Sequence, residues 1–280
     1  MTTAPPPPPQ QYLATGFRDV DGSADTPACT RCLDLIAGIP FFRRVKEESF
    51  RILAGTRPGC IFDAGCGAGN DLASLAALLP PGFRLVGLDA SARLLATAAE
   101  RTAAHGSRCS LVRGDLLSVP FRDNAFSACR IDRVLQHLHD PGRAVRELVR
   151  VLEPGGTLLA FDNDWDTLTL SMDNRHAAAA LTRFWSDSFA SGRVGKDLAA
   201  LFSAAGLTDV IAEPRTLTLT EPEIAGKVFD IPALLDRMNA AGLLTPGEMQ
   251  EIKDDLTRNA RRGTFASGYT GYLVRGRKPE

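Results

Sequence analysis

The sequence predicts an α/β fold in which a mostly parallel sheet is flanked by helices. Short apolar stretches alternate with Ala/Leu-rich stretches of helical length, which is the pattern of repeated strand–helix units. A glycine-rich turn follows the first predicted strand, and aspartates follow several of the others. Because ligands of open α/β sheets bind beyond the carboxyl ends of the strands, these turns and acids predict a ligand site at that edge.

Composition gives no sign of a nucleic-acid or membrane partner. The chain has 280 residues, of which 44% are hydrophobic, and its 32 Lys and Arg residues against 33 Asp and Glu leave a net charge of −1. This balance lacks the basic character expected of a nucleic-acid-binding protein. No apolar run approaches the roughly 18 residues of a membrane span, and the N-terminus lacks the basic-then-apolar pattern of a signal peptide.

Six cysteines are scattered along the chain without the spacing of a disulfide framework. Such thiols suit a reducing compartment, so we expect a cytoplasmic protein. Cys29 and Cys32 form a C-x-x-C pattern, but no second pair and no histidine cluster accompany them. We interpret them as two cysteines on one helix face and expect no metal site.

The chain is expected to divide into a Pro-rich tail, a helical cap and a main domain, over residues 1–11, 12–55 and 56–280. The tail contains the consecutive prolines Pro5 to Pro9 and is expected to be disordered. In the cap, Thr26-Pro27 favours the start of one helix and Pro40 its end, and a second helix is expected from Phe41 to Leu53. Both helices precede the first predicted strand and so form an addition to the sheet.

A glycine turn follows the first predicted strand, Cys60–Phe62. It reads Asp63-Ala64-Gly65-Cys66-Gly67-Ala68-Gly69, and a helix is expected from Asp71 to Leu79. Glycines at alternate positions permit φ > 0 and let backbone N–H groups approach a ligand. Together with the helix N-terminus they predict a cradle for a nucleotide-type ligand. A dinucleotide fingerprint would need its third glycine at Asn70, so NAD is disfavoured.

The second predicted strand, Phe83–Asp89, ends in a carboxylate. Asp89 lies about twenty residues beyond the glycine turn, which is the separation expected for an acid that binds both ribose hydroxyls. A helix is expected from Ser91 to His105, with Ser91 as its N-cap.

The third and fourth predicted strands have acids at the same end. Asp115 lies at the end of the third strand, Ser110–Leu116, and Asp132 follows the fourth, Ser127–Ile131. Parallel strands would bring these carboxylates to the edge of the sheet where Asp89 lies.

The C-terminal half continues the pattern and then departs from it. A fifth strand is expected over Thr157–Phe161 and a sixth opens at Gly206–Val210. Residues 217–262, with a helix from Thr245 to Asn259, are interpreted as an insertion that contributes to a substrate lid. The stretch Gly271–Arg277 then suits a last strand that runs antiparallel.

These motifs resemble those of the class I S-adenosylmethionine-dependent methyltransferases. Asp63-x-Gly65-x-Gly67-x-Gly69 is similar to their first motif, and the run from Arg150 to Gly156 is similar to the post-core motif of the ubiquinone and menaquinone methyltransferases. The resemblance covers roughly Gly59 to Asp162. It implies a Rossmann-like, seven-stranded methyltransferase fold with an antiparallel last strand.

The resemblance also implies a cofactor, S-adenosyl-L-methionine, which leaves as S-adenosyl-L-homocysteine. Asp115 would accept a hydrogen bond from the adenine amino group. The full set of residues expected to bind the cofactor is Asp63, Ala64, Gly65, Gly67, Asp89, Ala90, Asp115, Leu116, Ile131, Asp132 and Arg18.

Methyl transfer from a sulfonium needs alignment more than acid–base power, because the positive charge already activates the donor. If the acceptor must lose a proton, the candidate bases are His137, His139, Asp162 and Asp164, of which we select His137 and Asp164. Aromatic side chains that could enclose an aromatic acceptor are Tyr12, Phe17, Trp165 and Trp185, although buried aromatics are often only core residues.

The leading hypothesis is methylation of a small aromatic secondary metabolite. The runs Phe17–Asp21, Arg133–His137 and Asp164-Trp165 are similar to the indole C-methyltransferases of actinobacterial alkaloid pathways, which implies an indole acceptor. O- or N-methylation of another small molecule, such as a quinone or phenol, and a non-catalytic protein that binds S-adenosylmethionine and a partner remain alternatives. The N-terminal helices could cover the chain's own site or that of a second copy, so a homodimer through them also remains open.

Overall fold

The computed structural model describes residues 17, 20–22 and 26–280. The tail 1–11 and the predicted site residues Tyr12 and Arg18 lie outside this part of the chain. The described residues form a seven-stranded sheet in the order β3-β2-β1-β4-β5-β7-β6. Its strands are β1 (Cys60–Ala64), β2 (Arg84–Asp89), β3 (Cys109–Arg113), β4 (Phe126–Asp132), β5 (Leu152–Leu170), β6 (Thr208–Leu219) and β7 (Ser267–Arg277).

The direction of the strands confirms the predicted fold class. Neighbouring strands from β3 to β5 pair in parallel, whereas β7 runs antiparallel to both β5 and β6. The carboxyl ends of β1 to β5 therefore point to one edge of the sheet. The chain runs outward from β1 to β3 and then crosses over to β4, so the strand order reverses between the neighbouring strands β1 and β4.

Helices cover both faces of the sheet, because successive strand residues point to opposite sides. On one face, α3 (Pro40–Ala54) and α4 (Asn70–Leu78) pack with Ile61 and Phe161. On the other, α6 (Pro141–Val151) and α8 (Val194–Ala204) pack with Phe62 and Ala160. The helix α5 (Ala92–Thr102) begins at Ser91, whose hydroxyl accepts from Leu94 N as the predicted N-cap.

The cap before β1 contains α2 (Thr26–Gly38) and α3 among the described residues. Pro40 begins α3 at its first turn, where proline needs no hydrogen-bond partner for its nitrogen. The buried side of α3 includes Phe42, Val45 and Phe50. These apolar contacts fix the cap against the sheet.

Strands β5, β6 and β7 are longer than the sequence indicated. The fifth strand was predicted only for residues 157–161. Residues from 217 onward were assigned to an insertion and not to the sixth strand. Both strands continue through Thr-Leu-Thr-Leu runs, Thr167–Leu170 and Thr216–Leu219, whose leucines are buried. Alternating β-branched and apolar residues favour a half-buried strand. Residues 217–219 therefore belong to β6 and not to the predicted insertion, and a helical segment follows Leu219.

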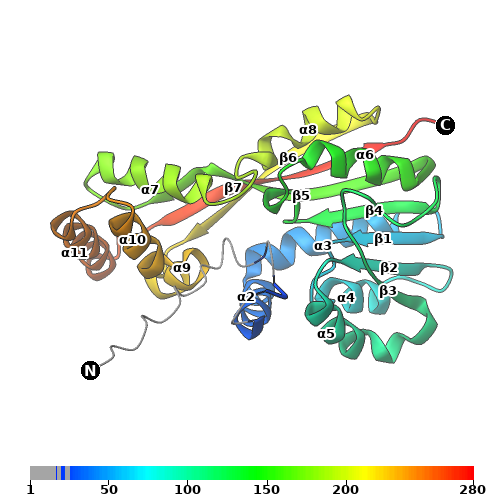
Figure 1. Cartoon of the computed structure of the whole chain (residues 1–280), viewed down its shortest axis with the longest axis horizontal. Coiled ribbons are helices and arrows are strands. Elements are labelled where there is room, and N and C mark those ends of the chain that lie inside the picture. Colours follow the sequence, from blue (N-terminus) through cyan, green and yellow to red (C-terminus); the bar gives the residue numbers. More distant parts are fainter. Residues whose placement is uncertain (1–16, 18–19, 23–25) are drawn as a thin grey trace, which may run out of the picture.

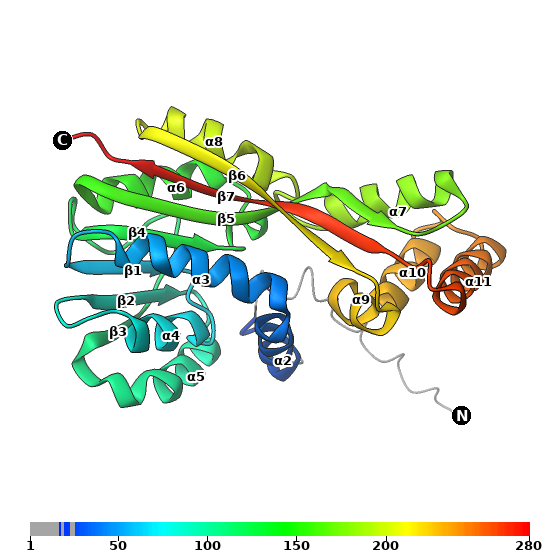
Figure 2. The same ribbon diagram turned by 180° about the vertical axis from the view of Figure 1, so that it is seen from behind.

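The segment between β6 and β7 contains α9 (Pro222–Phe229), α10 (Ile231–Ala240) and α11 (Pro246–Arg262). With α7 (Arg175–Asp187) these helices gather around the extended ends of β5, β6 and β7, away from α4 and α5 (Figure 1; Figure 2). α11 begins with a capping box between Thr245 and Glu248. None of the helices in the described part of the chain is both long and apolar enough to cross a membrane.

Candidate functional site

The glycine turn adopts a backbone that only glycine accommodates without strain. Gly65, Gly67 and Gly69 have φ of 74°, 54° and 78°. A Cβ on Gly65 would lie 2.5 Å from Val134 Cγ2, and one on Gly69 would lie 2.8 Å from the backbone of Ala98. Close packing and positive φ together explain why alternate glycines are required here.

Backbone hydrogen bonds hold this turn against the end of β2. Gly65 N and Cys66 N both donate to Leu88 O, over 2.8 and 2.9 Å. Gly67 N donates to Asp89 Oδ2 over 2.8 Å, and Ser91 N donates to Asp89 Oδ1 over 2.9 Å. Burial raises the pKa of the Asp89 carboxyl, while these hydrogen bonds favour its charged form. The predicted ribose-binding acid is thus fixed beside the glycine turn.

A cavity of about 250 Å³ opens at the carboxyl ends of the strands. Predicted cofactor residues that line it are Gly65, Gly67, Asp89, Ala90, Asp115, Leu116 and Asp132. Asp63 and Ala64 at the end of β1, and Ile131 in β4, are instead buried below the cavity lining. The switch point between β1 and β4 therefore carries most of the predicted cofactor set.

Asp63 takes part in a buried ion-pair network. Arg130 contacts Asp63, Asp71 and Asp132 over 2.9, 2.7 and 2.6 Å, and only 3% of the Arg130 side chain is exposed. Burial raises the pKa of Asp63 to about 6 although Arg130 lowers it. Burial also raises the pKa of Asp71, but Arg130 and Lys46 outweigh it and bring that pKa down to about 2.

The same network attaches the cap to the cavity wall. Lys46 of α3 contacts Asp71 of α4 over 2.5 Å. Arg133, which lines the cavity, contacts Asp132 over 2.8 Å, and its guanidinium lies 4.8 Å from the ring centre of Phe42 in α3. The orientation of Asp132 and Arg133 therefore depends on contacts that reach the N-terminal helices.

Asp21 also belongs to this region, although the sequence did not indicate it. Asp21 accepts from Ser91 Oγ over 2.6 Å and from Ala92 N over 2.9 Å, and it contacts Arg113 over 3.3 Å. These hydrogen bonds, led by that from Ser91, lower the pKa of Asp21. Asp21 thus joins the segment before α2 to the N-terminus of α5. The run Phe17–Asp21 was singled out in the sequence, but no local pattern indicates this partner.

Aromatic rings form the opposite wall of the cavity. Trp165 stacks on Phe189 at 5.2 Å and 20°, and its ring centre lies 4.3 Å from that of Tyr269. Trp185 meets Trp165 edge-on at 5.4 Å, and Phe17 lies 5.7 Å from the ring of His137. All of them line the cavity. The predicted acceptor residues Phe17, Trp165 and Trp185 are thus brought together, and Phe189 and Tyr269 join them.

Gln136 connects this wall with the loop after β4. Its Oε1 accepts from Trp165 Nε1 over 2.8 Å and from Asn163 Nδ2 over 3.0 Å. Its Nε2 donates to Arg133 O over 3.2 Å and lies 3.2 Å from His137 Nε2. Gln136 is only 5% exposed, so these contacts fix the tryptophan and the asparagine in one arrangement.

The two predicted bases occupy different surroundings. His137, in the short 3₁₀ helix η2 (Leu135–His137), lines the cavity between Phe17 and Phe189. Asp164 is buried outside the cavity lining, and Lys196 Nζ lies 3.7 Å from its Oδ1. The structure therefore does not bring Asp164 together with His137.

Asp162 lies beneath the cavity rather than on its surface. It is 1% exposed and accepts from Asn163 N over 2.9 Å and from Gln136 N over 3.2 Å. Burial raises its pKa to about 7. Asp162 thus joins β5 to the loop that carries Gln136 and His137.

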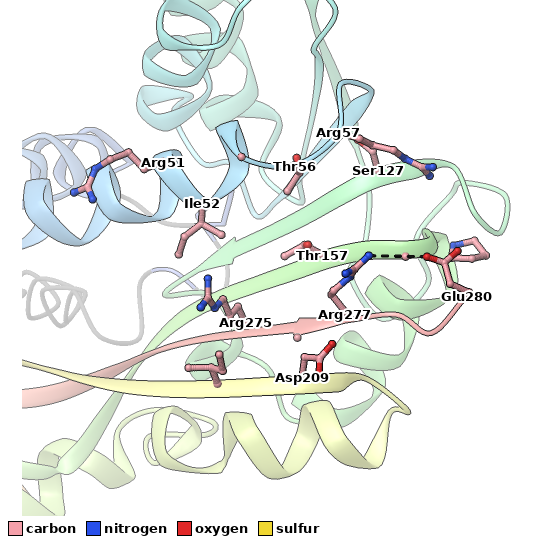
Figure 3. A pocket seen from close by; sticks show the side chains of 15 residues that line it. Arg51, Ile52, Thr56, Arg57, Ser127, Thr157, Asp209, Arg275, Arg277 and Glu280 are labelled. Carbon is pink, nitrogen blue, oxygen red and sulfur yellow. Dashed lines mark ion pairs between the residues drawn. The ribbon is translucent and has the colours of Figure 1, made fainter.

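A second, larger concavity lies at the amino ends of the strands. It encloses about 630 Å³ between the C-terminal end of α3 and strands β4 to β7. Figure 3 shows Arg51, Arg275 and Arg277 on its walls, with Asp209 from β6 and Glu280 at the rim. We call it the arginine groove. Its charged side chains are largely exposed, and its lining contains no aromatic ring from the described part of the chain.

Known proteins match this chain over the region just described. A family model of the methyltransferase domain matches residues 62–160. An uncharacterized 37.1 kDa protein in transposon TN4556 of Streptomyces fradiae is 34% identical over 244 residues, which cover 86% of this chain and 69% of that protein. Demethylmenaquinone methyltransferase of Staphylococcus aureus is 33% identical over 138 residues, 48% of this chain and 57% of that enzyme.

Solved structures show the same fold at lower identity. Phosphoethanolamine N-methyltransferase 2 of Haemonchus contortus, solved in complex with S-adenosyl-L-methionine, superposes with a TM-score of 0.57 and 16% identity. The superposition covers 96% of this chain and 61% of that chain.

Proposed function

The chain belongs to the class I S-adenosylmethionine-dependent methyltransferases, and we propose that it methylates a ring carbon of a small, indole-type aromatic molecule. The observation that carries this proposal is the composition of the cavity. One side consists of the glycine turn and strand-end carboxylates, and the other consists of aromatic rings. Such a cavity suits a polar cofactor and a flat apolar acceptor placed next to each other.

The cofactor side fits S-adenosylmethionine by the chemistry of its groups. Asp89 offers carboxylate oxygens suited to ribose hydroxyls, and Asp115 offers an acceptor suited to the adenine amino group. Gly67 leaves open space, because among the described residues a Cβ there would meet only Leu33, at 3.5 Å. When bound, the cofactor supplies an electrophilic methyl group on a sulfonium.

The acceptor side supports an aromatic substrate. The ring centre of Trp165 lies 5.2 Å from that of Phe189 and 4.3 Å from that of Tyr269, and Trp185 meets Trp165 edge-on. Aromatic rings bind other rings by offset and edge-to-face packing. The cluster is held rigid by Gln136, so a planar acceptor would meet a preformed wall.

An indole carbon can attack a methyl group without losing a proton first, so the chain needs mainly to align the two reactants. The new carbon–carbon bond forms as the bond from sulfur to the methyl carbon breaks, and the positive charge passes to the ring. A proton leaving the ring would be taken up by His137, which lines the cavity. Because Asp164 does not line the cavity, the proposal assigns proton transfer to His137 alone.

A second candidate function is methylation of a quinone-type or phenolic ring. The Staphylococcus aureus relative is named for its action on demethylmenaquinone, although the match spans only 57% of its length. The same aromatic wall would accept such a ring. The two candidates differ in the group that the ring presents to the cavity, either an indole N–H or a phenolic oxygen.

The test is incubation of the full chain with S-adenosylmethionine and, separately, with indoles, reduced quinones and phenols. The expected product is an indole that has gained one CH₂ by mass and whose new methyl is on a ring carbon by NMR. Methylation at oxygen or nitrogen would contradict indole C-methylation and favour the alternative. No product with any ring, from a chain that still binds the cofactor, would favour a non-catalytic protein.

The proposal places the enzyme in the cytoplasm, where its scattered thiols stay reduced. It also includes a homodimer through the N-terminal helices, which light scattering of the purified chain would test.

A further inference from the structure

Asn163 has a buried acceptor that finds no hydrogen-bond partner in the described part of the chain. Its side chain lines the cavity, and only 2% of the residue is exposed. Among the described residues, no donor reaches Asn163 Oδ1. A buried carbonyl without a hydrogen bond costs about 1–3 kcal/mol, so such an atom in a functional cavity indicates a ligand.

The surrounding hydrogen bonds determine which atom of the amide is the oxygen. Trp165 Nε1 can only donate, so the Gln136 atom that it meets over 2.8 Å must be Oε1. Gln136 Nε2 then donates to Arg133 O. The Asn163 atom that lies 3.0 Å from Gln136 Oε1 must therefore be the NH₂ group. The opposite atom, which lacks a partner, is the carbonyl oxygen.

The backbone around Asn163 prevents this carbonyl from turning away. Asn163 N donates to Asp162 Oδ1 over 2.9 Å, and β5 pairs Asn163 with Gly271 of β7. Gly195 of α8 packs so closely that a Cβ there would lie 2.6 Å from Asn163 C. Since Gln136 also holds the NH₂ group, the acceptor is preorganised before any ligand binds.

We propose that Asn163 Oδ1 accepts a hydrogen bond from an N–H or O–H of the methyl acceptor and thereby selects rings that carry a donor. The inference rests on the proposed function and specifies its substrate class. Gln136 Oε1 accepts from both Asn163 Nδ2 and Trp165 Nε1, so the amide of Asn163 lies next to the tryptophan of the aromatic wall. Both residues line the cavity, and a ring packed on that wall would therefore present its edge to the amide.

This hydrogen bond also helps the reaction with an indole. As the ring carbon forms its bond to the methyl group, positive charge develops at the ring nitrogen. The Asn163 carbonyl then accepts from an increasingly acidic N–H, so the hydrogen bond is stronger in the transition state than in the ground state. No proton leaves the nitrogen, and Asn163 remains neutral throughout.

The experiment compares ring pairs that differ in one donor: indole with indene, and phenol with toluene. Their affinities are measured by titration into the full chain saturated with S-adenosylhomocysteine. For one pair at least, the wild-type protein should bind the donor-bearing ring about tenfold more tightly. Asn163→Leu should bind both members equally, and Asn163→Asp, which keeps an acceptor, should retain the preference.

Affinity for S-adenosylhomocysteine serves as the control for folding and for the cofactor side. It should change less than about threefold in both variants, because the inference assigns the carbonyl to the acceptor. A variant that loses cofactor affinity but keeps the ring preference would overturn the inference and assign Oδ1 to the cofactor. The absence of preference in both wild-type pairs would also overturn it.

The two ring pairs distinguish a failure of this inference from a failure of the proposed function. A preference for phenol over toluene, without one for indole over indene, would support the role of Asn163 and overturn an indole acceptor. A preference for indole that Asn163→Leu abolishes would support both.

Discussion

Two of the concavities among the described residues lie on the same sheet but at opposite ends of its strands, and their linings differ. The cavity at the carboxyl ends encloses about 250 Å³, and the arginine groove at the amino ends encloses about 630 Å³. The smaller one contains the left-handed glycines, the strand-end acids and a carbonyl without a partner. The larger one contains exposed charges. The residues that line a concavity, rather than its volume, therefore identify the candidate site.

The burial of the charges explains the difference. In the arginine groove, the Arg277 side chain is 56% exposed and lies 3.9 Å from Glu280, so water screens most of their attraction. Below the cavity, Arg130 is 3% exposed and contacts three carboxylates. A buried charge must keep its partners, and its geometry is correspondingly fixed. Fixed groups can recognise a ligand, whereas solvated ones adapt to water.

The largest effect is expected from removing one arginine at each place. Arg130→Met leaves buried carboxylates without their cation and should lower the free energy of unfolding by about 3–5 kcal/mol. Arg277→Met, the matched control, should change it by less than about 0.5 kcal/mol. Urea denaturation of both variants measures the difference. Equal losses would show that the contrast in burial does not govern stability.

The next effect concerns histidines on the same loop. His137→Asn should lower kcat about a hundredfold with the acceptor found by product screening, since it removes the group that takes the ring proton. His139→Asn is the control, because His139 does not line the cavity. Asp164→Asn tests the other predicted base and should resemble the control. A loss for Asp164→Asn as large as that for His137→Asn would refute the assignment to His137.

A smaller effect should appear in the pH dependence of stability. Burial raises the pKa of Asp162 from 3.8 to about 7, so the folded state binds its proton more tightly than the unfolded state. The stability that protonated Asp162 contributes to the folded state is complete below the pKa that this residue has in the unfolded chain. It is lost as pH rises through about 7. Asp162→Asn lacks this loss. Its Tm relative to wild type should therefore rise by a few degrees between about pH 5 and pH 8. A constant difference would contradict the raised pKa.

The cofactor side of the cavity could be predicted because its signals are local. The glycines of the turn alternate within five residues, and Asp89, Asp115 and Asp132 lie at or just past the ends of strands that the apolar pattern reveals. The sheet topology then brings these strand ends together. Asp63 and Ala64 occupy the expected positions of the motif, but they lie within the buried strand β1 and do not reach the cavity.

The acceptor side could not be predicted in the same way. Tyr269 meets Trp165 only because β7 pairs antiparallel with an extended β5, a register that no local pattern specifies. Side chains alternate along β5, so Asn163 and Trp165 line the cavity while Asp164 points away. The sequence favoured Asp164 as a candidate base and gave no signal for Asn163, although the two residues are adjacent in the chain.

The most direct test of the account is titration of S-adenosylmethionine into the wild-type chain and into one acid variant at each concavity. Asp89→Asn at the cavity should weaken binding about tenfold or more, because it removes a charged acceptor for the ribose. Asp209→Asn in the arginine groove should bind as the wild type does. Unchanged affinity for Asp89→Asn, or a loss for Asp209→Asn, would contradict the assignment of the site to the carboxyl ends of the strands.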